Sequence, residues 1–171
     1  MRNDNERFSA PYAEFVALES SVLSFRPITG LRQTEISGDL AKARSDHKLP
    51  IPTCGAGAKT SATYALAMRR DRMLVVNGPM LQDGWHDSGY AVSDMSSAHV
   101  AFEFEGSATM DLLSRGTDID FNNQSAGVAR QFRGFDILLY QANCGAAVRL
   151  HIGHGHADTF YRWVQGQFAG L

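Results

Sequence analysis

The sequence has few of the features that mark secreted, membrane-spanning or nucleic-acid-binding proteins. Its two cysteines, Cys54 and Cys144, lie far apart and form no CxxC pair, which favours free thiols in a reducing compartment over a disulfide scaffold. No apolar run approaches the ~20 residues that cross a membrane. Residues 1–7 are polar and charged with no apolar stretch behind them, so we expect no signal peptide. These absences predict a cytoplasmic protein without membrane contacts.

An excess of one charge is also lacking. The chain has 16 Lys and Arg against 18 Asp and Glu, and the basic residues do not gather in one stretch. We therefore expect no nucleic-acid partner. Hydrophobic residues are abundant instead: they make up 44% of the 171 residues, and charged residues make up 20%. This composition is typical of one globular domain with a sizeable core.

The chain is organised around a predicted strand–helix–strand unit over residues 94–121. Residues 99–105 alternate, with Val100, Phe102 and Phe104 on one face and His99, Glu103 and Glu105 on the other. This period of two predicts a strand with one buried face. The paired carboxylates on the other face could serve acid–base chemistry, but without a pocket a solvated or partner-facing surface is favoured.

A short helix is expected after this strand, over residues 108–115. Ser107 is positioned to cap its N-terminus, and Gly116 supplies its end. Ser96 is better explained by a turn, and no GxSxG motif or Ser–His–Asp order is present. The chain then re-extends through residues 118–121.

Other segments are assigned from periodicity and from turn residues. Further strands are expected over 31–37, 62–68, 73–76, 128–133, 135–141 and 147–152, and further helices over 39–45 and 156–168. The strand over 135–141 is apolar on both faces, which predicts a central strand covered on both sides. Trp85, in an irregular stretch, is expected to fill the core. The element order predicts an α+β fold of two small ferredoxin-like units, whose antiparallel sheets carry helices on one side.

The N-terminal residues 1–26 are predicted to form a tail and a docking segment, followed by one α+β domain over residues 27–171. Within it, residues 12–25 carry Phe15, Leu18 and Val22 at helical spacing, which is typical of an amphipathic helix. Such an amphipathic segment either folds back on the domain or docks on another protein, and the sequence leaves both possibilities open.

Two clusters deserve a test as binding sites. The run Gly55-Ala56-Gly57-Ala58-Lys59-Thr60 departs from the GxxxxGK[ST] phosphate loop, because Ala58 stands where glycine is required, so a loop is favoured. His151, His154 and His156, with Asp158 nearby, are the best metal candidates, but histidines at a strand–helix junction are weak evidence without converging geometry. We therefore predict no catalytic, cofactor-binding or metal-binding residue.

Three stretches of the chain resemble a known family. The block Asp94–Ala108 is similar to the "DVS…SGPxA" block of the folate-dependent aminomethyltransferase superfamily. The segment Leu112–Phe121 resembles the "vLakGcplDlhp" segment of the gamma subunit of heterotetrameric sarcosine oxidase, and Leu150–Val164 resembles the closing strand and helix of that subunit. Ser107 stands where the family usually has proline, and the "KGCYxGQE" signature of iron–sulfur-linked relatives is absent.

This resemblance implies an aminomethyltransferase-like folate-binding fold in a truncated member of the superfamily. It implies a non-catalytic gamma subunit that assembles with alpha, beta and delta subunits of a sarcosine oxidase-type flavoenzyme. FAD, FMN, NAD, tetrahydrofolate and zinc would then belong to the other subunits, which demethylate sarcosine or a related N-methyl amino acid and pass the one-carbon unit to tetrahydrofolate. The alternatives are a stand-alone folate-binding or aminomethyltransferase-like protein and a relative with a histidine metal site.

Overall fold

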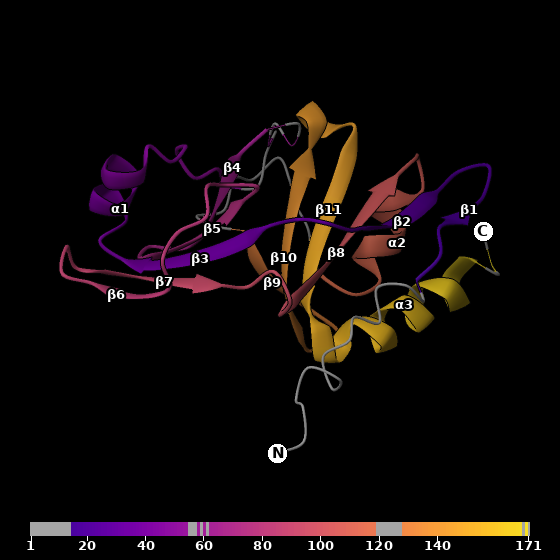
Figure 1. Ribbon diagram of the computed structural model, residues 1–171. Helices are drawn as coiled ribbons and strands as arrows, with labels where there is room; N and C mark the ends of the chain where they lie inside the picture. Colours follow the sequence, from indigo (N-terminus) through magenta and orange to yellow (C-terminus); the bar gives the residue numbers. More distant parts are fainter. Residues whose placement is uncertain are drawn as a thin grey trace, which may run out of the picture.

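Two antiparallel sheets form the protein, as seen in the computed structural model, which describes residues 15–54, 58, 60, 62–118, 128–168 and 170 (Figure 1). In the described residues the large sheet has the strand order β1 (Leu18–Glu19), β2 (Ser24–Ile28), β8 (His99–Glu105), β11 (Ala147–Gly153), β10 (Phe135–Ala142) and β9 (Ala129–Phe132). The small sheet has the order β4 (Tyr64–Arg69), β5 (Arg72–Val76), β3 (Gln33–Gly38), β7 (Tyr90–Asp94) and β6 (Gly84–His86). The predicted α+β class with antiparallel sheets is confirmed.

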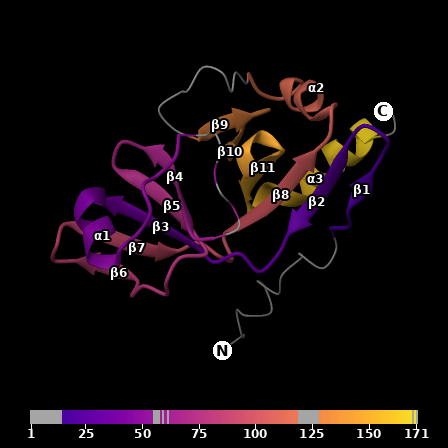
Figure 2. The ribbon, with the colours of Figure 1, turned by 90° about the horizontal axis from the view of Figure 1, so that it is seen from above.

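The chain begins in the large sheet, builds the small sheet and then returns. Strand β2 leads into β3 of the small sheet, and β7 leads back into β8, which pairs with β2 (Figure 2). The large sheet is therefore assembled from strands at both ends of the chain. This return path brings β3 and β8 to the seam between the two sheets.

In the part of the chain that the structure describes, three helices accompany the sheets, and a short 3₁₀ turn, η3 (Asn143–Gly145), joins β10 to β11. Helix α1 (Leu40–His47) lies beside the small sheet, and Asp39 caps it by accepting a 2.9 Å hydrogen bond from the backbone N–H of Lys42. Helices α2 (Thr109–Ser114) and α3 (His154–Phe168) pack on the large sheet (Figure 1). Among the described residues no helix is long and apolar enough to cross a bilayer.

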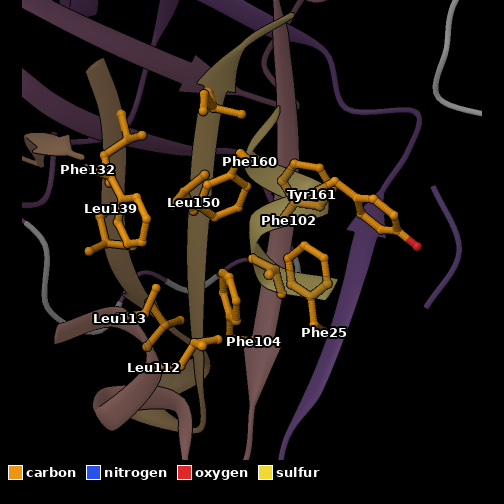
Figure 3. Close-up of a cluster of buried hydrophobic side chains, with 14 of the residues drawn as sticks. Phe25, Phe102, Phe104, Leu112, Leu113, Phe132, Leu139, Leu150, Phe160 and Tyr161 are labelled. Atoms are coloured by element: carbon orange, nitrogen blue, oxygen red, sulfur yellow. The ribbon is translucent and has the colours of Figure 1, made fainter. Parts of the chain in front are cut away.

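An aromatic core fills the space between α3 and the large sheet (Figure 3). The ring of Phe102 lies 4.9 Å from that of Phe25 and 5.6 Å from that of Phe160, measured between centroids. Phe102 and Phe25 are completely buried. The apolar side of the alternation in residues 99–105 is therefore buried, as predicted, and it packs against α3.

The opposite face of the large sheet packs on the small sheet. Along β10, Ile137 and Leu139 join the helix-side core, whereas Leu138 and Tyr140 join a second cluster with side chains of β4 and β5. The prediction of a central strand covered on both sides is confirmed. The second cluster joins the two sheets into one body.

The expected helix over residues 12–25 is wrong where the structure describes it. Residues 15–25 are largely extended and include β1 and the start of β2. Phe15, Leu23 and Phe25 are buried in the helix-side core, so these side chains serve the sheet and not a helical stripe. The described part of the N-terminal segment folds back on the domain. Residues 1–14 lie outside the described residues.

Details around α2 also differ from expectation. The N-cap residue is Ala108 and it makes no side-chain capping bond, so the predicted cap at Ser107 is wrong. A Cβ at Gly116 would lie 2.1 Å from Cζ of Phe132, which shows that the glycine is needed for close packing. The expected strand over 118–121 lies outside the described residues from position 119 onward.

The hairpins show how turn residues set the strand ends. Arg133 and Gly134 both have positive φ, 48° and 88°, and they form a two-residue turn between β9 and β10, so the strand expected over 128–133 ends one residue earlier, at Phe132. The strands expected over 62–68 and 73–76 leave a connection of four residues, but the observed connection is shorter, because β4 ends at Arg69 and β5 begins at Arg72. Trp85 does not fill the core, since it lies on β6 and is 70% exposed.

Candidate functional site

Polar side chains concentrate on the face of the large sheet that meets the small sheet. One row crosses four neighbouring strands, because Arg26 of β2 pairs in register with Glu103 of β8, Glu103 with Arg149 of β11, and Arg149 with Tyr140 of β10. Side chains in register on one face of a sheet are direct neighbours. We call this row, together with the residues it contacts across the seam, the inter-sheet network.

Glu103 is the only carboxylate between two arginines in this row. Its Oε2 accepts a 2.6 Å hydrogen bond from Nε of Arg149, and its Oε1 accepts from Arg26 at 3.0 Å. Burial acts to raise the pKa of Glu103, but the hydrogen bonds from Arg149 and Arg26 outweigh it and hold the pKa below its usual value. Arg26 also pairs with Glu105 at 3.0 Å.

The predicted surface position is therefore wrong for Glu103, which is 2% exposed, whereas the Glu105 side chain is 41% exposed. Neighbouring arginines allow this carboxylate to be buried in its charged form. Since both oxygens are already bonded to guanidinium groups, the geometry fits an ion-pair anchor better than a proton-transfer group.

A chain of hydrogen bonds continues across the seam from this row. The hydroxyls of Tyr64 and Tyr140 lie 2.8 Å apart, the Tyr140 hydroxyl lies 2.8 Å from Nε2 of His151, and Nδ1 of His151 lies 2.6 Å from Oε1 of Gln33. Gln33 comes from β3 and Tyr64 from β4, so the chain joins the small sheet to the large one. It starts at Arg149, which contacts the Tyr64 hydroxyl at 3.4 Å.

The direction of these bonds follows from their chemistry. Nε2 of Gln33 donates to the backbone carbonyl of His99 at 3.2 Å, so its amide oxygen must face His151. His151 then donates from Nδ1 and accepts at Nε2 from the Tyr140 hydroxyl. Tyr140 in turn accepts from Tyr64.

The titration behaviour of His151 agrees with this assignment. Burial, and to a lesser degree His99 and Arg149, lower the pKa of His151 to about 3, so its ring is neutral at pH 7. Burial raises the pKa of Tyr140 well above its usual value. Each donor faces an acceptor, which makes the inter-sheet network a fixed polar brace.

The remaining candidate histidines do not converge with His151. His151 is buried on β11 and faces the seam, whereas His154 and His156 lie in the first turn of α3. The ring of His156 lies 4.8 Å from that of Phe135. Within the part of the chain that the structure describes, no group of three or more His, Cys, Asp or Glu side chains could hold a metal ion.

The glycine-rich run is described only in part, because residues 55–57 and Lys59 lie outside the described residues. Ala58 forms an isolated bridge with Ala142 of β10, and the Thr60 hydroxyl donates to Oδ1 of Asn143 at 2.7 Å. These contacts fasten the loop to η3. Ser96 occupies a turn as predicted, and its backbone N–H donates to Oδ1 of Asp94 at 2.9 Å.

Sequence reasoning missed Gln33, Tyr64, Tyr140, Arg26 and Arg149. A signal for part of this set was present. Arg149 and His151 alternate with apolar residues in β11, a strand that lies inside the sheet between β10 and β8. A charged residue at such a position needs a partner of opposite charge on a neighbouring strand.

The two antiparallel sheets, with helices α2 and α3 on the outer face of the large one, define an α+β fold. No protein-family model matches the chain, and no curated protein matches it. Among solved structures, the chain is similar to a chain of the heterotetrameric sarcosine oxidase from Corynebacterium sp. U-96, solved in complex with pyrrole 2-carboxylate. The TM-score is 0.70 at 14% identity, and the match covers 98% of this chain and 93% of that chain. At this identity the likeness shows the fold.

Proposed function

We propose that this chain is a non-catalytic, gamma-type accessory subunit of a heterotetrameric sarcosine oxidase-type flavoenzyme. The observation that carries the proposal is the likeness to a chain of heterotetrameric sarcosine oxidase at TM-score 0.70. The match covers 98% of this chain and 93% of the other, so it extends over nearly all of both. This supports a correspondence between subunits and not between a domain and part of a larger enzyme.

In the proposed assembly the alpha, beta and delta subunits hold FAD, FMN, NAD, tetrahydrofolate and zinc. They would oxidatively demethylate sarcosine or a related N-methyl amino acid and pass the one-carbon unit to tetrahydrofolate. The contribution of this chain would be to stabilise the complex. The inter-sheet network supports a structural role, because the buried ends of Glu103, Tyr140 and His151 are bonded to one another or to neighbouring side chains.

The test is co-expression of the tagged chain with the alpha, beta and delta subunits of a heterotetrameric sarcosine oxidase. We expect a co-purifying complex with flavin absorbance and sarcosine-dependent oxidation, and a less stable complex when this chain is omitted. The chain purified alone should show neither turnover of sarcosine nor saturable binding of tetrahydrofolate by calorimetry. Turnover or folate binding by the isolated chain would support the stand-alone enzyme and reject the accessory role.

A second variant tests the N-terminal arm. Since residues 15–26 include β1 and most of β2 of the large sheet, only residues 1–14 can be removed without cutting into the described fold. We propose that residues 1–14 help to hold a partner subunit. Removal of these residues should lower the yield of co-purified complex, and an unchanged yield would reject the arm proposal while leaving the subunit proposal intact.

A further inference from the structure

A cavity of about 210 Å³ lies at one end of the seam between the two sheets. Arg69 and Arg72, which flank the turn between β4 and β5, line it on one side, and Arg130 of β9 also contributes. His151 and Gly153 of β11 line the large-sheet side. We call this space the arginine cavity.

The arginine cavity carries an excess of positive charge. Among the described residues that line it, Asp136 is the one carboxylate, and Oδ1 of Asp136 accepts a 3.3 Å hydrogen bond from Nε2 of Gln131. The two lining histidines do not add charge at pH 7, because burial lowers the pKa of both His99 and His151. The guanidinium groups therefore set the sign of the local potential.

Arg72 is only partly satisfied by protein groups. Its NH1 lies 3.3 Å from Oε1 of Glu35, but its Nε is buried and has no hydrogen-bond partner among the described residues. A buried N–H without an acceptor is costly, so the protein groups around Arg72 leave part of its hydrogen-bonding capacity unused. A guanidinium offers several N–H groups in a planar fork that matches carboxylate and phosphate oxygens.

The cavity also has room on its large-sheet side. Gly153 lies two residues beyond His151 on β11 and so faces the same side of the sheet. A Cβ built at Gly153 would meet nothing within 4 Å, so no side chain among the described residues fills this space. At about 210 Å³ the cavity is smaller than the roughly 300–1,000 Å³ of sites for drug-sized ligands, so it suits a small ion.

We propose that the arginine cavity binds a small oxyanion, a carboxylate or a phosphate, through the guanidinium groups of Arg72 and Arg69. The oxyanion would accept hydrogen bonds from Arg72 and would screen the positive charges that meet at the seam. It would thereby tie the β4–β5 hairpin to the large sheet. This inference does not depend on the proposed accessory role.

The experiment measures the melting temperature of the full chain in sodium phosphate, sodium acetate and sodium chloride at matched ionic strength. We expect a saturable rise with phosphate or acetate beyond that with chloride, because a ligand that binds only the folded state stabilises it. A rise with phosphate alone assigns a phosphate site, and a rise with acetate alone assigns a carboxylate site. The same melting temperature in all three salts would overturn the proposal.

Three variants locate the effect by calorimetry. Gly153→Val fills the open space and Arg72→Gln removes the guanidinium, and each should weaken anion binding at least tenfold. Arg162→Gln is the matched control, because the Arg162 side chain is 74% exposed on α3, and it should bind as the wild type does. Equal binding in Arg72→Gln and wild type would overturn the proposal even if Gly153→Val fails to fold.

Discussion

The two faces of the large sheet are stabilised by different means. The face under α3 is closed by aromatic and aliphatic side chains, with Phe102 at its centre, and its stability comes from burial of apolar surface. The face toward the small sheet combines an apolar cluster with the inter-sheet network, whose stability depends on the partner of every polar group. The first face tolerates approximate shapes, whereas the second demands matched donors and acceptors.

The largest effect is expected from a cavity in the apolar face. Phe102→Ala removes a completely buried ring that contacts Phe25 and Phe160, and it should lower the free energy of unfolding by about 4 kcal/mol. Urea unfolding followed by circular dichroism measures this loss. Met80→Ala, at a side chain that is 83% exposed, is the control and should leave stability within about 0.5 kcal/mol of wild type.

The next effect tests the polar face through its carboxylate. Glu103→Gln leaves Arg149, whose side chain is 12% exposed, without its counter-charge, and should cost about 3 kcal/mol. Glu105→Gln is the matched control on the same strand, because its exposed pair with Arg26 should contribute at most about 1 kcal/mol. Equal losses in the two variants would contradict the distinction between a buried anchor and a surface pair.

The two faces should also differ in their response to acid. His151 has a pKa of about 3 in the folded protein and about 6.5 in an unfolded chain, so only the unfolded state binds a proton between these values. Stability should therefore fall as pH decreases through this window, by up to about 1.4 kcal/mol per pH unit. Below the usual glutamate pKa, protonation of Glu103 adds to the loss, because its folded-state pKa is lowered.

Unfolding curves from pH 7.5 to pH 4.5 measure this slope. His151→Gln removes one titrating ring and should reduce the slope above pH 4.5, and the remaining slope comes from His99, whose pKa burial also lowers. The substitution also weakens the protein at pH 7.5. His156→Gln, at an exposed position on α3, should keep the wild-type slope. A wild-type slope retained in His151→Gln would show that another group causes the acid response.

The smallest effect concerns the hydroxyl pair of the inter-sheet network. Tyr140→Phe leaves Nε2 of His151 without its donor and should cost about 2 kcal/mol, and Tyr64→Phe should cost about 1 kcal/mol. The double variant should lose less stability than the sum of the two single losses, because the Tyr64–Tyr140 hydrogen bond is already broken in each single variant. Strict additivity would indicate that the two hydroxyls act independently.

The apolar face could be predicted from the sequence and the polar face could not. Alternation in residues 99–105 and the stripe of α3 specify which side chains are buried, because periodicity reports burial directly. Glu103 was assigned to the surface by the same rule, since a period of two separates faces but does not reveal that both are covered. The arginines that neutralise it come from strands distant in sequence, and pairing of that kind leaves no local pattern.

The N-terminal segment shows a second limit. Phe15, Leu18 and Val22 match helical spacing, but the segment adds two strands beside β8 and buries Phe15, Leu23 and Phe25. Tertiary packing overrides a short periodic signal of this kind. The likeness to a sarcosine oxidase chain in overall fold was accessible from sequence motifs, whereas the location of the inter-sheet network was not.

The return path of the chain has a consequence for biosynthesis. Arg26 bonds to Glu103, 77 positions later, so β2 leaves the ribosome long before the strand that will cover its edge exists. Until then Phe25 and its neighbours are exposed on a nascent chain, which favours slow closure of the large sheet and a need for protection against aggregation. Strand β2 is thus synthesised early, but it can pair with β8 only after residues 99–105 have been made.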